Sequence, residues 1–111
     1  MSKDEKDDLK FIADYYLTKC GAENQLNKLS EECGELIQIA CKHNDVYVKY
    51  SNYSEEKLAE EIADVEILLY QVKYLLTIRN LVKEKKKEKI ERQLERIKQY
   101  DEEEERFKQC Q

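Results

Sequence analysis

The sequence predicts an all-α protein, and three of its features indicate that fold class. Proline is absent from the 111 residues, and glycine occurs only at Gly21 and Gly34. Charged residues make up 41% of the chain, a proportion that favours solvated helices over turn-rich sheets. Apolar side chains recur at the helical period in several stretches. We therefore expect a single domain over residues 1–111, built as a four-helix bundle.

The first two helices are expected before residue 44. Leu9, Ile12 and Tyr16 share one face over residues 4–19, and Gly21 is expected to end that helix. A second and longer helix is expected over residues 22–43. Its apolar positions are Leu26, Leu29, Cys33, Leu36, Ile37 and Ala40.

The second pair of helices follows a polar linker over residues 43–54. Ser54 stands at an N-cap position before two glutamates, so the third helix is expected to begin there and to end at about Arg79. The remainder has many charges and a thin apolar stripe, which predicts a fourth helix. Its last part, residues 100–111, is expected to be a frayed tail.

Charge and cysteine usage narrow the functional classes. The net charge is −5, yet residues 83–98 carry eight basic and four acidic side chains. We therefore expect no nucleic-acid partner, although this basic strip could hold phosphate or an acidic protein. No apolar run reaches the roughly 18 residues that a membrane span needs. The four cysteines show no CxxC spacing and the N-terminus lacks a signal-peptide pattern, so a cytoplasmic protein with no membrane partner is expected.

An acidic strip on the second helix is one half of the candidate site. At the helical period, Gln25, Lys28, Glu32 and Glu35 lie on one strip next to the apolar face, whereas Glu31 points further outward. Glu32 and Glu35 therefore flank the face that is expected to be buried. A run of glutamates on a helix is also typical of a solvated surface, so this strip alone does not define a site.

A matching strip on the third helix carries Glu61 and Asp64 beside its apolar face. If both apolar faces pack in one bundle, the four carboxylates converge and repel one another unless a cation lies between them. Oxygen ligands suit Mg²⁺ or Mn²⁺. Gly34 would let a neighbouring helix or a ligand approach these acids closely. The predicted metal ligands are Glu32, Glu35, Glu61 and Asp64.

The paired motifs resemble the signature of the MazG-like all-α nucleoside triphosphate pyrophosphohydrolases, which is EExxE followed after a gap by ExxD. The stretch "KLSEECGELIQIACK" carries Glu31, Glu32 and Glu35, and "EEKLAEEIADVEILLYQVKYLL" carries Glu61 and Asp64. Between Glu35 and Glu61 lie 25 residues. The likeness covers residues 22 to about 98.

The resemblance implies hydrolysis of a nucleoside triphosphate between its α and β phosphates, releasing the monophosphate and pyrophosphate in nucleotide-pool cleaning or control. It implies that the four predicted ligands bind Mg²⁺ and that all six motif acids, Glu31 and Glu60 included, take part in catalysis. The family often has a KFxRRF-like pattern on the next helix, where this chain reads "KIERQL". Lys89 and Arg92, with Lys86, are the corresponding phosphate contacts, and assembly as a homodimer or homotetramer is expected.

Other roles remain open in the sequence. Gln25 and Lys28 are candidates for sugar or phosphate contacts, and Tyr15 or Tyr16 could stack a base, although aromatic residues at helical spacing are also typical of a core. A ferritin-like di-iron site needs ExxH motifs, which this chain lacks. The rival class is a non-catalytic helical interaction or nucleotide-binding module, in which residues 83–98 bind an acidic partner.

Overall fold

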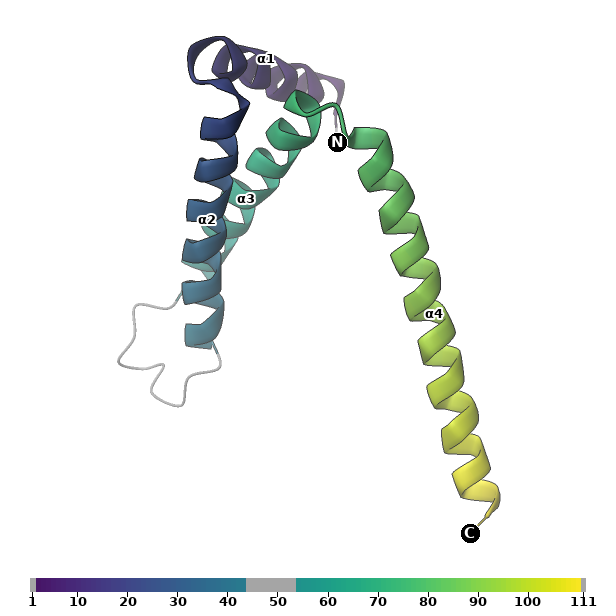
Figure 1. Ribbon diagram of the computed structural model, residues 1–111. Helices are drawn as coiled ribbons and strands as arrows, with labels where there is room; N and C mark the ends of the chain where they lie inside the picture. The colour runs from purple at the N-terminus through teal and green to yellow at the C-terminus, as the bar shows by residue number, and fades with distance from the viewer. Residues whose placement is uncertain (1, 44–53, 111) are drawn as a thin grey trace. The chain divides into compact units, whose positions relative to one another are not determined.

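The computed structural model describes residues 2–43 and 54–110, of which 93% are helical, and it has no strand among them. The helices are α1 (Lys3–Lys19), α2 (Gly21–His43), α3 (Glu55–Leu75) and α4 (Arg79–Gln109) (Figure 1). The predicted all-α class is confirmed. The chain divides into one unit that ends at Thr77 and a second that begins at Ile78 and contains α4. Of the linker predicted over residues 43–54, residues 44–53 lie outside the described part of the chain.

Serine caps explain where α1 and α3 begin. The Oγ of Ser2 accepts a hydrogen bond from the Glu5 N–H at 3.1 Å, and the Oγ of Ser54 accepts one from the Lys57 N–H at 3.1 Å. Each cap satisfies an amide that the helix leaves without a partner, which typically stabilises a helix by about 1 kcal/mol. The N-cap predicted at Ser54 is confirmed.

Gly21 separates α1 from α2, as predicted. Its φ of +81° lies in the left-handed region that favours glycine, and the backbone N–H of Cys20 donates to the Tyr16 carbonyl oxygen at 2.8 Å. The chain therefore turns within one residue, and α2 begins at Gly21 itself.

The predicted end of the third helix at Arg79 is wrong, because α3 ends at Leu75 and α4 already begins at Arg79. Between them Thr77 adopts a φ of +55°, a left-handed conformation that breaks the helix. No glycine or proline marks this break, and threonine is uncommon in that conformation. The apolar pattern therefore gave no sign of it.

The second unit consists of α4 and is described by itself. None of its helical residues is buried, and the stripe of Ile90, Leu94 and Ile97 is exposed. The helix continues through residues 100–109, so the frayed tail stays a prediction about the protein in solution. No helix in the described parts of the chain is long and apolar enough to cross a bilayer.

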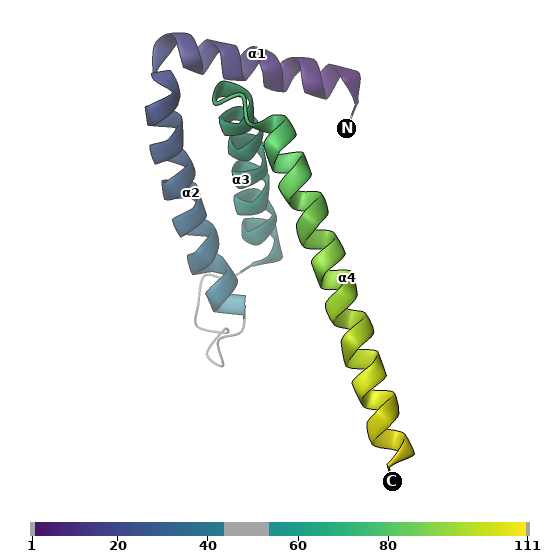
Figure 2. The same cartoon turned by 45° about the vertical axis from the view of Figure 1, so that its right-hand side comes forward.

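In the first unit, α2 packs lengthwise against α3, and the two run antiparallel (Figure 2). Helix α1 contacts α3 more extensively than it contacts α2. The buried apolar side chains are Ala13, Ile39, Val65, Leu68 and Val72. Burial of a valine or leucine side chain contributes roughly 1.5–3 kcal/mol, so this short list makes a small core.

The buried line of α2 differs from the predicted apolar face. It runs through Gln25, Glu32 and Ile39, which are spaced seven residues apart. Leu26 and Ile37, which the sequence places on the buried face, are 39% and 63% exposed. The reason is that α3 covers the polar side of the predicted arc. Glu32 is therefore drawn into the interior instead of lying at its edge.

The expected close approach of a neighbouring helix at Gly34 is wrong for the described residues, while the approach of a ligand stays a prediction. A Cβ atom built on Gly34 would meet no neighbouring atom within 4 Å. Gly34 follows Glu32 by two residues, so it faces away from the side of α2 that α3 covers.

Gly34→Ala should therefore raise the free energy of unfolding by about 1 kcal/mol, because alanine fixes the helical backbone at a lower entropy cost. Urea denaturation monitored by circular dichroism measures this change. Gly21→Ala is the matched control and should destabilise the protein, because alanine is strained at a φ of +81°. A loss of stability in Gly34→Ala would contradict the open surroundings at that position.

Candidate acidic metal site

Three of the four predicted ligands come together between α2 and α3. Glu61 and Asp64 lie one turn apart on α3 and meet Glu32 of α2, and one carboxylate oxygen from each residue lies within 4.8 Å of the other two. Glu32 is buried, Glu61 is half-buried and Asp64 is exposed. The cluster therefore leads from the interior to the surface, which would let a small ion enter.

Two oxygens of this triad have no partner in the described parts of the chain. Glu32 Oε2 and Glu61 Oε2 are buried and take part in no hydrogen bond. Leaving a buried charged acceptor unsatisfied costs more than the 1–3 kcal/mol typical of a neutral group. Magnesium binds oxygen at about 2.1 Å, so two of its ligands lie at most about 4.2 Å apart. Small side-chain movements would bring the triad to that distance, and its all-oxygen donor set fits Mg²⁺ or Mn²⁺.

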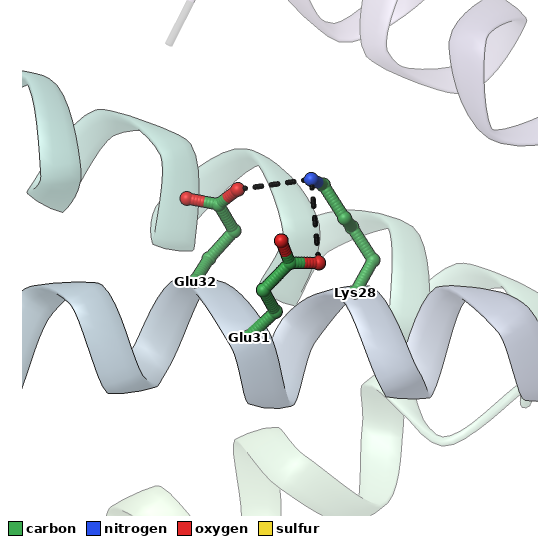
Figure 3. Close-up of polar contacts among 3 residues, drawn as sticks. All are labelled: Lys28, Glu31 and Glu32. Carbon is green, nitrogen blue, oxygen red and sulfur yellow. Dashed lines mark ion pairs between the residues drawn. The ribbon is translucent and has the colours of Figure 1, made fainter.

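Among the described ion pairs, Lys28 is the cation that contacts an acid of the triad. Its Nζ lies 3.2 Å from Glu32 Oε1 and 3.6 Å from Glu31 Oε2 (Figure 3). The hydrogen bond with Glu32 and the charges of both glutamates raise the pKa of Lys28. The Lys28 side chain is 49% exposed and that of Glu32 only 11%. Lys28 therefore reaches inward from the surface and offsets part of the negative charge.

Glu35 lies outside the triad but adjoins it. The charge of Glu32 and a hydrogen bond with it raise the pKa of Glu35, and Glu61 adds to the effect in the same two ways. Glu35 is itself exposed. A fourth carboxyl group thus lies against acids from both helices, and either a proton or a metal cation would relieve the repulsion.

The two accessory acids of the motif lie at the surface. Glu31 is exposed and bound to Lys28, and Glu60 is exposed on α3. Neither belongs to the triad. Glu31 is linked to the triad through Lys28, which pairs with both Glu31 and Glu32.

The predicted phosphate contacts Lys86, Lys89 and Arg92 are exposed on α4, and the structure places them only within that unit. The spacing of Lys85, Lys89, Arg92 and Arg96 puts these four on one face of α4, with Lys86 beside it. The sequence prediction followed the family pattern and missed Lys85 and Arg96. Helical spacing alone was enough to find them.

A cavity of about 370 Å³ lies beside the acids in the first unit. The side chains that line it include Tyr16, Gln25, Lys28, Glu32, Asp64 and Gln71. Both predicted substrate contacts on α2 thus line it. Tyr16 lines it too, while Tyr15 packs edge-on against the Tyr16 ring at 5.5 Å between centroids.

Gln71 is the residue at this cavity that the sequence prediction missed. It is 3% exposed, and its Oε1 has no hydrogen-bond partner among the described residues. Gln71 lies on the strip of α3 that also carries Asp64, seven residues earlier. A polar residue two turns beyond an acid on the same strip was the signal that could have revealed it.

Fold and site together define an all-helical protein with an acidic cluster on an antiparallel helix pair, next to a small polar cavity. Comparison of the chain with protein-family models finds no match, and comparisons with curated proteins and with solved structures find none either. The resemblance to the MazG-like enzymes therefore depends on the two motifs.

Proposed function

We propose that this chain is a Mg²⁺-dependent nucleoside triphosphate pyrophosphohydrolase of the MazG-like type. It would cleave a ribo- or deoxyribonucleoside triphosphate between the α and β phosphates. The observation that carries the proposal is the triad of Glu32, Glu61 and Asp64, with two buried oxygens that lack hydrogen-bond partners, beside a cavity. The EExxE and ExxD motifs support it independently.

The four acids would bind the metal, and one of them would also orient the attacking water. Glu32, Glu61 and Asp64 would hold Mg²⁺, with Glu35 as the fourth ligand. The ion would neutralise phosphate oxygens and lower the pKa of a bound water. An exposed carboxylate among these four would orient the attacking water and accept its proton.

Lys28 contributes the positive charge nearest to the cavity. It lines the cavity and already neutralises Glu32, so a phosphate oxygen can take the place of the Glu32 oxygen once that acid has another partner. The family pattern alone keeps Lys86, Lys89 and Arg92 of α4 as proposed phosphate contacts.

Lys28→Met should change the affinities for metal and for nucleotide in opposite directions. Mg²⁺ should bind several-fold more tightly, because a competing cation near Glu32 is removed, whereas the triphosphate should bind about tenfold more weakly. Titration calorimetry with MgCl₂ and with a non-hydrolysable triphosphate measures both. Lys108→Met is the matched control, since it removes an i,i+4 ion pair with Glu104 on α4 and should change neither affinity. Parallel weakening of both ligands would show that Lys28 only supports the fold.

Product analysis tests the proposed reaction. Canonical and modified nucleoside triphosphates are incubated with the full chain and Mg²⁺, and the products are separated by anion exchange. The monophosphate and pyrophosphate are expected in equal amounts, and chelation of the metal should stop their release. Formation of the diphosphate and inorganic phosphate, or no turnover of any substrate, would contradict the proposal.

We propose that a second copy of the chain covers the exposed apolar side of the α2–α3 pair. Leu26 and Ile37 on α2, and Ile62, Leu69 and Leu76 on α3, are each between 38% and 63% exposed. In antiparallel helices these two stripes lie on the same side of the pair, away from the acids. Sedimentation velocity should show a dimer or a tetramer at micromolar concentration, and a stable monomer would exclude this assembly.

The second candidate function is an interaction module, and the observation that favours it is the basic face of α4. Lys85, Lys89, Arg92 and Arg96 are all exposed along that helix. Such a face would bind an acidic partner without any reaction. This alternative does not account for the buried and unpartnered oxygens of the triad.

A further inference from the structure

The cavity beside the triad is lined by two buried glutamines, and the acidic cluster does not explain why they are buried. Gln71 of α3 is 3% exposed and Gln25 of α2 is 5% exposed, and both line the cavity. Gln71 Oε1 is buried and accepts no hydrogen bond. A buried amide oxygen in this state destabilises the protein by roughly 1–3 kcal/mol, so its presence indicates a ligand that supplies the missing donor.

The charge of the wall limits the chemistry of that ligand. An amide oxygen accepts hydrogen bonds and cannot bind a phosphate oxygen, which is also an acceptor. Glu32 and Asp64 at the same cavity repel anions as well unless a cation intervenes. The group that reaches Gln71 Oε1 is therefore not an anion, and it must present an N–H or O–H.

The rest of the wall favours a flat and largely apolar group. Ile67 and Leu68 of α3 line the cavity, and Tyr16 of α1 adds an aromatic side chain. A volume of about 370 Å³ is near the lower end for small-molecule sites, which limits the occupant to a group of one or two rings. A nucleobase has apolar faces, and its edge carries N–H donors beside acceptor atoms.

We infer that this cavity binds the base of the nucleotide and that Gln71 is its specificity-determining contact, accepting a hydrogen bond from an N–H on the edge of the base. The amide nitrogen of Gln71 donates to the neighbouring acceptor of the base, so the side chain makes a two-point contact. Glu32 and Asp64 line this cavity and belong to the triad, so the phosphates would leave it toward the metal site. The inference rests on the proposed function, because that function places the triphosphate at the triad.

Gln71→Met tests the inference, because methionine keeps the length of the side chain and removes the amide. Binding is measured in the presence of Mg²⁺ for non-hydrolysable analogues of the four common ribonucleoside triphosphates and for tripolyphosphate, which has no base. The wild-type protein should bind its preferred nucleotide more tightly than tripolyphosphate. In Gln71→Met this advantage should fall by at least about tenfold, and the preference among bases should narrow.

Two controls separate recognition from folding. Tripolyphosphate affinity should stay unchanged in Gln71→Met, and its melting temperature without ligand should stay equal or rise, because an unsatisfied buried group is removed. Gln38→Met changes an exposed glutamine of α2 and should leave every affinity unchanged.

The remaining outcomes overturn the inference in distinguishable ways. An unchanged base preference in Gln71→Met, with nucleotides still bound, would overturn the role of Gln71 and leave the proposed function standing. Equal affinity of the wild-type protein for tripolyphosphate and every nucleotide would overturn the base pocket alone. If neither nucleotides nor tripolyphosphate bind, the proposed function fails and the inference fails with it.

Discussion

Glu61→Gln should abolish pyrophosphate release and at the same time stabilise the metal-free protein. The substitution keeps the size of the side chain but removes a charge from the triad, so turnover should fall by at least about 100-fold. In the presence of a chelator the melting temperature should rise by several degrees, for a gain of about 1 kcal/mol, because Glu61 no longer repels Glu32 and Glu35 and no longer buries an unpartnered charged oxygen.

The combination of lost activity and gained stability identifies a binding site, because a purely structural residue would show a loss of both or of neither. Glu66→Gln is the matched control, since Glu66 is exposed on the same helix and outside the triad. It should change neither the rate nor the melting temperature. Turnover by Glu61→Gln at the wild-type rate would remove the triad from the mechanism.

The convergence of the acids could be predicted because it follows from two short-range patterns. Helical spacing puts Glu61 beside Asp64, and the apolar stripes of two consecutive helices bring those acids toward Glu32. The caps at Ser54 and Gly21 were equally local, so they were predicted correctly.

The wrong predictions about α2 have one physical cause, which is that helical periodicity does not show which face of a helix packs against its neighbour. Single-helix periodicity shows that α2 has a polar strip next to an apolar one, but it does not say which of them α3 covers. The structure puts Glu32 under α3 and leaves Leu26 and Ile37 exposed, which reverses the expected order of burial. The role of Gly34 was inferred from its position beside the acids, and no described helix approaches it closely.

Thr77 and Gln71 were missed for different reasons. The break between α3 and α4 depends on one threonine in the left-handed region, for which neither composition nor periodicity gives a signal. Helical spacing puts Gln71 on the strip of Asp64 but gives it no role, and its place in the cavity lining comes from the packing of α1, α2 and α3. Helical spacing does not encode the backbone conformation of Thr77, and the burial of Gln71 depends on tertiary packing.

Magnesium ions should raise the melting temperature of the wild-type protein. Binding to the folded state alone stabilises it by RT ln(1 + [Mg²⁺]/Kd), which is about 2.7 kcal/mol at a hundredfold excess over Kd. For a chain of this size that gain corresponds to a shift of roughly 10 °C. Differential scanning calorimetry over a series of MgCl₂ concentrations measures it, with KCl at matched ionic strength as the control for screening.

The same titration separates the enzyme from the interaction module. If the triad binds the ion, Glu61→Gln should lose most of the shift, and a non-hydrolysable triphosphate should add a further shift in the wild-type protein only when Mg²⁺ is present. An interaction module that binds through the basic face of α4 should show no shift with Mg²⁺. A triphosphate held by Lys89 and Arg92 would stabilise it equally with and without the metal. If Mg²⁺ leaves the melting temperatures of the wild-type protein and of Glu61→Gln equally unchanged, the triad does not bind the ion. That result would rule out the metal site.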